Sequence, residues 1–181
     1  MALDEFTLLG DALWLDFVNS ARGRTPTPPD RLPDAAAYAR WCGLHHLDLG
    51  DDPTPLPQAR ELRARLTELA EALHEGRRPP AGAIAALNEL LARSVGRDQL
   101  TRVGGEWRLR FAPIRPFAAL EAIARSAAAT VAETRTAVRR CAGESCSLFF
   151  IDDSPNGSRR WCVASVCGRD ARVERRRGLR R

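Results

Sequence analysis

Residues 141–168 read CAGESCSLFFIDDSPNGSRRWCVASVCG and contain four of the five cysteines of this 181-residue chain. The four form two C-x4-C pairs, Cys141 with Cys146 and Cys162 with Cys167, separated by 15 residues. Each short loop can present two thiolates to one edge of a tetrahedron, as in structural zinc sites. Two disulfides are the alternative, but they need an oxidising compartment. The spacing therefore predicts one zinc ion held by these four cysteines.

A structural role is expected for this metal. Four thiolates close the coordination sphere, whereas a catalytic zinc keeps one position open for water. The chain has no H-E-x-x-H motif, and its three histidines, His45, His46 and His74, lie far upstream. No nucleophile stands at a recognisable spacing from a base. We therefore expect no catalytic residues and no enzymatic activity.

The residues between the two cysteine pairs favour a β-hairpin. Residues 148–151 are apolar and favour a strand, 154–157 read SPNG and favour a turn, and 159–162 return toward the second pair. A module of about 30 residues cannot be stabilised by core burial alone, so we expect a bound metal to stabilise it. The apolar cluster beside the metal is expected to contain Phe150, Trp161 and Val166.

Charge is unevenly distributed along the chain. All 28 basic residues are Arg; residues 1–138 hold 17 of them against 18 acids, and residues 139–181 hold 11 against 5. A basic segment at one end of a near-neutral body is typical of a chain that contacts a polyanion. After Cys167 the sequence GRDARVERRRGLRR predicts a short basic helix; the alternative is a solvated end whose arginines pair with nearby acids. The candidate phosphate contacts are Arg159, Arg160, Arg169, Arg172, Arg175 and Arg176.

The rest of the chain has mostly helical hydrophobic spacing. A hairpin with a Gly104-Gly105 turn is expected near residues 100–111, because Trp107, Leu109 and Phe111 alternate with arginines. The predicted fold is mainly α with a small β-hairpin: a helical domain over 1–138, joined by a long helix to a zinc-binding hairpin and short basic helix over 139–181. The predicted helices cover residues 10–21, 34–42, 57–75, 81–94 and 116–140.

A few polar residues stand out in this body. Asp16 and Asn19 lie inside the apolar first helix, so they either bond backbone or a neighbouring Arg, or line a small-ligand pocket. Cys42 is expected to pack as a small apolar residue. Arg108 and Arg110 lie either on a solvated strand face or on an extended nucleic-acid surface.

The motifs also resemble a known family. The pattern C-x4-C, F-x-D-x-S-x-N-x-x-R-R-W-C and x4-C-G over 141–168 resembles the CGNR zinc finger, and LWLDFVNSARGR over 13–24 with WCGL over 41–44 is similar to the helical ABATE domain that precedes it. The resemblance implies a bacterial stress-induced transcription regulator. The chain departs from the signature at Arg169-Asp170, where the family has Asn-Arg. Either Arg169 takes over a phosphate contact and Asp170 caps the helix, or this chain recognises different DNA bases from those that other members of the family recognise.

These features predict a zinc-dependent, DNA-binding regulator whose body senses a signal or dimerises. DNA is the expected partner, together with a homodimer and with a protein or small-molecule signal for the N-terminal domain. The alternative is a zinc-ribbon adaptor that docks an acidic protein. No stretch approaches the roughly 20 apolar residues of a membrane span, and the acidic start MALDEF predicts a cytoplasmic protein.

Overall fold

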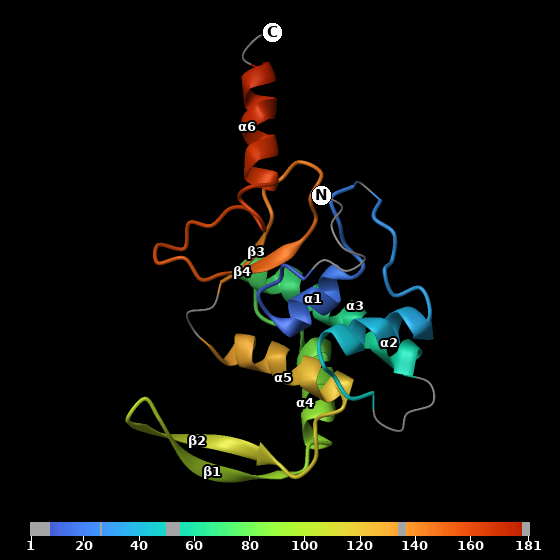
Figure 1. The fold of residues 1–181 in the computed structure, drawn as a ribbon, viewed down its shortest axis with the longest axis vertical. Coiled ribbons are helices and arrows are strands. Elements are labelled where there is room, and N and C mark those ends of the chain that lie inside the picture. Colours follow the sequence, from blue (N-terminus) through green and yellow to red (C-terminus); the bar gives the residue numbers. More distant parts are fainter. Residues whose placement is uncertain (1–7, 26, 50–54, 134–136, 179–181) are drawn as a thin grey trace.

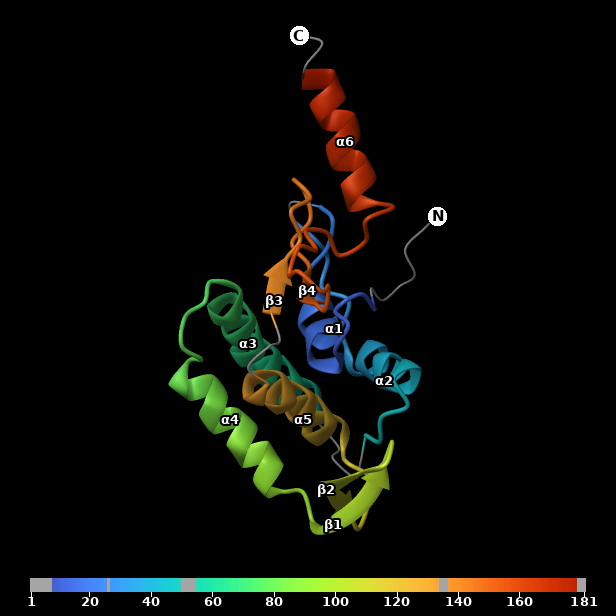
Figure 2. The same cartoon turned by 90° about the vertical axis from the view of Figure 1, so that its left-hand side faces the viewer.

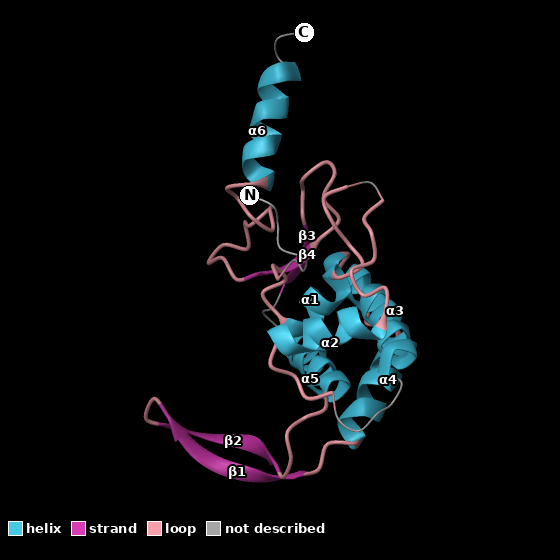
Figure 3. Cartoon of the chain, turned by 45° about the vertical axis from the view of Figure 1, so that its right-hand side comes forward, coloured by secondary structure: helices cyan, strands magenta, loops and turns pink. Residues whose placement is uncertain are grey.

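The computed structural model describes residues 8–25, 27–49, 55–133 and 137–178. It is mainly helical with two small antiparallel sheets, which confirms the predicted fold class (Figures 1 and 3). The elements, in chain order, are α1 (Leu13–Asn19), α2 (Ala35–Leu44), α3 (Pro55–His74), α4 (Ala81–Ala92), β1 (Gly96–Val103), β2 (Glu106–Pro113), α5 (Ala119–Ala132), β3 (Ala137–Arg140), β4 (Phe149–Asp152) and α6 (Cys167–Gly178). No helix in these ranges is both long and apolar enough to cross a membrane.

One apolar core joins α1 to α5. Trp14 of α1 is fully buried, and its indole N–H donates to Thr130 Oγ1 of α5 at 2.9 Å. Phe17 packs 5.2 Å from the Trp41 ring of α2, centroid to centroid. Helix α2 begins where predicted, because the Asp34 carboxylate accepts the N–H of Ala37 at 2.7 Å. The helical body therefore follows the apolar periodicity of the sequence.

The hairpin of β1 and β2 extends away from this body (Figures 1 and 3). Gly104 and Gly105 both have positive φ, 59° and 88°, as the two-residue turns of hairpins require. Among the described residues it packs on the body at its base, where Phe111 lies 6.2 Å from the ring of Phe117 and the Arg125 guanidinium of α5 lies 5.0 Å from the Phe111 centroid. The turn and pairing agree with prediction, although both strands are longer than predicted.

The long helix predicted over 116–140 is wrong. Helix α5 ends at Ala132, and Ala137–Arg140 form strand β3 instead. After the helix, residues 134–138 read TRTAV, and their β-branched side chains favour strand over helix. Val138 is buried in the main core, so pairing in a sheet also gains burial for this strand.

The hairpin predicted between the two cysteine pairs is also wrong in its second strand. Strand β4 forms where predicted, but it pairs with β3, so that Val138 faces Ile151, and residues 159–162 form no strand. Strand β3 lies against α3 and β4 lies against α1 (Figure 2), and Phe149 is fully buried in the core of the body. A domain boundary at residue 138 stays a prediction.

Candidate metal centre and nucleic-acid interface

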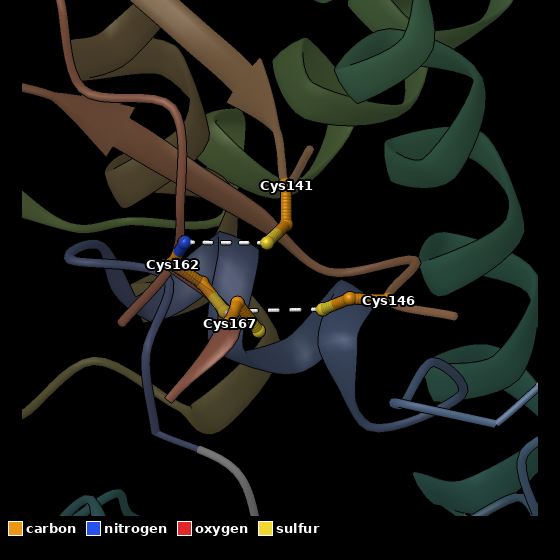
Figure 4. A group of neighbouring side chains, drawn as sticks. All are labelled: Cys141, Cys146, Cys162 and Cys167. Carbon is orange, nitrogen blue, oxygen red and sulfur yellow. Dashed lines mark hydrogen bonds between the residues drawn. The ribbon is translucent and has the colours of Figure 1, made fainter. Parts of the chain in front are cut away.

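Four cysteine sulfur atoms meet at one place in the structure (Figure 4). Cys141 follows β3, Cys146 precedes β4, Cys162 lies in the loop after β4, and Cys167 is the first residue of α6. The sulfur atoms all lie within 4.8 Å of one another; Cys162 Sγ is 3.8 Å from Cys146 Sγ and 3.7 Å from Cys167 Sγ. Tetrahedral zinc with Zn–S bonds of about 2.3 Å separates its sulfur ligands by about 3.8 Å. The donor set therefore fits one zinc ion.

These distances contradict the disulfide alternative. All five cysteines are free, and the sulfur separations far exceed a disulfide bond of about 2.05 Å. The fifth, Cys42, is buried in the body, where burial raises the pKa of its thiol to about 11. It packs as a small apolar residue, as predicted.

The four sulfur atoms act on one another's pKa values: that of Cys141 is lowered, whereas those of Cys146, Cys162 and Cys167 are raised by hydrogen bonding among the sulfur atoms and by burial. Hydrogen bonds from Cys146 and Cys162 hold the pKa of Cys141 far below its usual value, and the backbone N–H of Cys162 also donates to Cys141 Sγ at 3.4 Å. At Gly143, a Cβ atom would lie 3.1 Å from Cys146 Cβ and 3.4 Å from Cys167 Cβ. Glycine therefore lets the loop of the first pair close around the metal.

The loop between β4 and Cys162 is ordered by its own polar side chains. The Asp152 carboxylate accepts the N–H and hydroxyl of Ser154 at 3.1 and 2.6 Å, and the Ser154 hydroxyl accepts the N–H of Ser158 at 2.8 Å. These bonds from Ser154 lower the pKa of Asp152. Gly157 takes a positive φ of 58° within the same turn. The D-x-S part of the motif therefore shapes this loop.

Arg159 is held inside the same loop. Its guanidinium lies 4.5 Å above the Phe150 ring, and one quarter of the side chain is exposed. Its donors reach three backbone carbonyl groups and one carboxylate, those of Ile151, Trp161, Cys162 and Asp11, at 2.6 to 3.2 Å. These contacts favour a structural role for Arg159 over a phosphate contact.

The other candidate arginines are more accessible. Arg160 is exposed, with its guanidinium 5.2 Å from the centroid of a Trp161 ring. Arg169 and Arg172 are exposed on the first turns of α6. The backbone of Arg175 and Arg176 lies in α6, but their side chains fall outside the described part of the chain. Their contacts with nucleic acid stay a prediction.

The apolar cluster beside the sulfur atoms agrees only partly with prediction. Leu148 and Phe150 are fully buried there, and Trp161 is partly buried against them. Leu9 and Val163 complete the cluster, whereas Val166 is not part of it. Leu9 comes from the N-terminal body, a contribution that no local spacing in the cysteine segment indicates.

Three contacts fix the start of α6. Cys167 belongs to the sulfur cluster. Gly168 lies against the Trp161 ring, so closely that a Cβ atom at Gly168 would be 3.3 Å from Trp161 Cδ2. Asp170 lies within the first turn and accepts a hydrogen bond from Arg24 at 2.5 Å, so the expectation that it caps the helix is wrong. Burial opposes protonation of Arg24, but the Cys167 sulfur and the Asp170 carboxylate raise its pKa overall. Within the signature, Asp170 therefore ties the helix to the body.

A second tie joins the body to β4. The Asn19 amide donates to the Phe149 carbonyl at 2.8 Å, and its oxygen accepts the Phe149 N–H at 2.9 Å. Gly23 and Ser147 likewise exchange backbone and hydroxyl bonds at 2.9 to 3.1 Å. Asn19 thus bonds backbone, which was one of the two expectations for it. The partner lies 130 residues away, and no local sequence signal indicates it.

The sequence matches the ABATE family, described as "putative stress-induced transcription regulator", over residues 11–143. The chain belongs to the ABATE family. Its C-terminal segment matches the CGNR zinc finger over residues 137–180. No curated protein matches the sequence closely enough to count as a relative.

The match and the sulfur cluster together support one structural zinc ion in this ABATE protein, which is a zinc-binding, regulator-like chain. ABATE and CGNR are regulatory and zinc-binding families, not enzyme families. The structure also gives most CGNR motif residues a local role, because they shape the loop and seat α6. The exposed arginines remain as the groups that can contact a partner.

Asp16 gives the ABATE body a testable pH dependence. Its carboxylate accepts the Gly10 N–H at 2.7 Å, and burial raises its pKa to about 6 despite this bond. Because the folded state holds this proton more tightly than the unfolded state, stability falls as pH rises from about 4 to 6 and stays lower above that range. We expect Asp16→Asn, which keeps an acceptor oxygen, to be more stable than wild type by about 3 kcal/mol at pH 7 and by roughly half of that at pH 5.

Urea unfolding of both proteins at the two pH values measures this effect. The difference between wild type and variant cancels the pH dependence of the metal site, which both share. An equal difference at pH 5 and pH 7 would show that Asp16 does not titrate in this range.

Proposed function

We propose that this chain is a zinc-dependent DNA-binding transcription regulator in which α6 contacts the DNA. The main support for this proposal is the placement of α6, which extends from the metal centre away from the helical body (Figures 1 and 2). Arg169 and Arg172 are exposed on it at a spacing that places both on one face. A helix fits the major groove of B-DNA, and the 12 residues of α6 extend for about 18 Å.

The zinc site acts in this proposal by holding α6 in place. Cys141, Cys146, Cys162 and Cys167 are the proposed ligands, and Cys167 is also the first residue of the helix. A closed four-thiolate sphere leaves no position for a substrate, which supports a structural and not a catalytic metal. Zinc supplies fixed geometry here and no reaction step.

The proposed phosphate contacts lie on and beside α6. Arg160 lies before the helix, and Arg169 and Arg172 lie on its first turns, all exposed. Arg175 and Arg176 follow on the same helix in sequence. Arg159 is left out of this surface, since its donors are occupied within the loop. The surplus of 11 arginines over 5 acids in residues 139–181 supports contact with a polyanion.

The double substitution Arg169→Ala and Arg172→Ala tests this assignment. We expect at least about a tenfold loss of affinity for duplex DNA at 0.1 M salt, because two phosphate contacts are removed. The slope of log K against log salt should become shallower by about 1.8, or 0.9 for each lost contact. Fluorescence anisotropy with a labelled duplex over a salt series measures both quantities.

A matched control is Arg65→Ala with Arg93→Ala, two exposed arginines on the helical body. This control should bind DNA as wild type does. Equal losses in the two double variants would contradict a role for α6. Unchanged DNA binding by the α6 variant, with loss of binding to an acidic protein, would instead support the adaptor alternative.

A further inference from the structure

The β1–β2 hairpin exposes a large apolar face that the function proposed above does not use. Leu100, Trp107 and Leu109 are 63%, 69% and 66% exposed. Leu100 and Leu109 are directly paired across the two strands. A two-stranded hairpin is marginally stable by itself in water, and among the described residues this one packs on the body only at its base. In Figure 1 the hairpin and α6 lie at opposite ends of the molecule.

The outer edge of β1 has free backbone groups in a defined pattern. Val103 and Glu106 flank the two-residue turn, so the N–H and C=O groups of each bond those of the other. In an antiparallel pair, every second residue directs its N–H and C=O groups toward the partner strand, so Thr101, Gln99 and Arg97 of β1 also bond β2. The backbone groups of Asp98, Leu100 and Arg102 therefore point to the open edge. Among the described residues this sheet contains β1 and β2 alone, so no other strand pairs with the outer edge of β1.

The charges along this edge complement a second copy of the same strand. Residues 98–102 read DQLTR, with opposite charges two positions on either side of Leu100. When two such strands pair antiparallel with Leu100 opposite Leu100, Asp98 of each copy lies opposite Arg102 of the other. Residues 98, 100 and 102 are also the ones whose N–H and C=O groups point to the open edge. In this register those groups can bond the second strand while each Asp98 pairs with an Arg102.

Within the part of the chain that the structure describes, Asp98 and Arg102 face no opposite charge across the hairpin. Across the hairpin Asp98 is paired with Phe111, and Arg102 is paired with Trp107. Among the residues that the structure describes, neither Asp98 nor Arg102 takes part in an ion pair. Arg102 makes one hydrogen bond, to the Gly105 carbonyl at 3.2 Å. Both charges are therefore available to another chain.

We propose that two copies of this chain dimerise through β1, forming a continuous four-stranded antiparallel sheet. In this register Leu109, Leu100 and the same two leucines of the second copy form one row across the sheet. In each neighbouring row Arg102 lies between Trp107 of its own hairpin and Asp98 of the second copy, a position suited to both a cation–π contact and an ion pair. Both α6 helices stay free, since they lie at the far ends from the hairpin (Figure 1). This dimer does not depend on DNA binding.

Charge reversal tests the register. Sedimentation or light scattering of the zinc-loaded full chain should give about twice the 20.0 kDa monomer mass for wild type at micromolar concentrations. Asp98→Arg or Arg102→Asp alone places like charges opposite each other twice in the dimer. Each should raise the dimer dissociation constant at least about tenfold. The double variant Asp98→Arg with Arg102→Asp exchanges the charges and should restore the dimer.

Arg110→Asp is the matched control, because Arg110 lies on β2, paired with Gln99 on the other face of the hairpin. It should leave the dimer intact. A wild type that stays monomeric at 100 µM would overturn the proposal. So would a dimer that persists in both single variants, since another surface would then join the copies. A double variant that remains monomeric with the melting temperature of wild type would overturn the register.

Discussion

Removing zinc from the purified protein is expected to lower its melting temperature by about 10 °C and to reduce its helical circular dichroism. The four cysteine ligands come from three separate segments and the start of α6. Among the described residues, only two apolar side chains beside them, Leu148 and Phe150, are fully buried. Free zinc at 1,000 times its dissociation constant stabilises the folded state by about 4 kcal/mol. Each kcal/mol shifts the melting temperature of a chain of this size by about 2–4 °C.

Cys162→Ser tests the same expectation without a chelator. Metal analysis should find one zinc per wild-type chain and a clear loss of zinc in the variant. Cys42→Ala is the matched control, because Cys42 is buried in the body and is not part of the sulfur cluster. Full zinc content and an unchanged melting temperature in Cys162→Ser would contradict the assigned ligand set.

Asn19→Ala is expected to destabilise the zinc-loaded protein by about 3 kcal/mol. The fully buried side chain of Asn19 makes two hydrogen bonds to the backbone of Phe149, and the substitution leaves that N–H and C=O without a partner in the core. Each buried polar group left unsatisfied costs about 1–3 kcal/mol. Urea unfolding in the presence of zinc measures the change.

Asn88→Ala provides the comparison for this loss. Asn88 is exposed in the middle of α4, so its replacement should change the unfolding free energy by no more than about 0.5 kcal/mol. If Asn19→Ala were as stable as Asn88→Ala, the tie between α1 and β4 would not contribute to the fold.

Local patterns in the sequence predicted the elements that depend on local physics. The apolar stripe of α3, the Asp34 cap of α2 and the Gly104-Gly105 turn each arise from interactions within a few residues. The sulfur cluster could be predicted because two C-x4-C pairs give one tetrahedral donor set. In each case the spacing alone restricts the geometry.

Contacts between distant segments could not be read in the same way. Strand β3 forms because Val138 gains burial against the body, a benefit that helical periodicity does not encode. The Arg24–Asp170 and Asn19–Phe149 contacts join residues more than 100 positions apart. The role of Arg159 could not be read either, although three of its four partners lie within eight residues, since an arginine in a basic segment looks the same whether it faces DNA or backbone carbonyl groups.

The most direct test of the central claim is DNA binding by the full chain with and without its metal. Anisotropy of a labelled duplex should be followed over a salt series for zinc-loaded, chelated and zinc-restored protein. The account predicts binding that chelation abolishes and added zinc restores, with a slope of log K against log salt near −4.5 for about five phosphate contacts. Absence of binding at low salt by protein that carries one zinc per chain would contradict it.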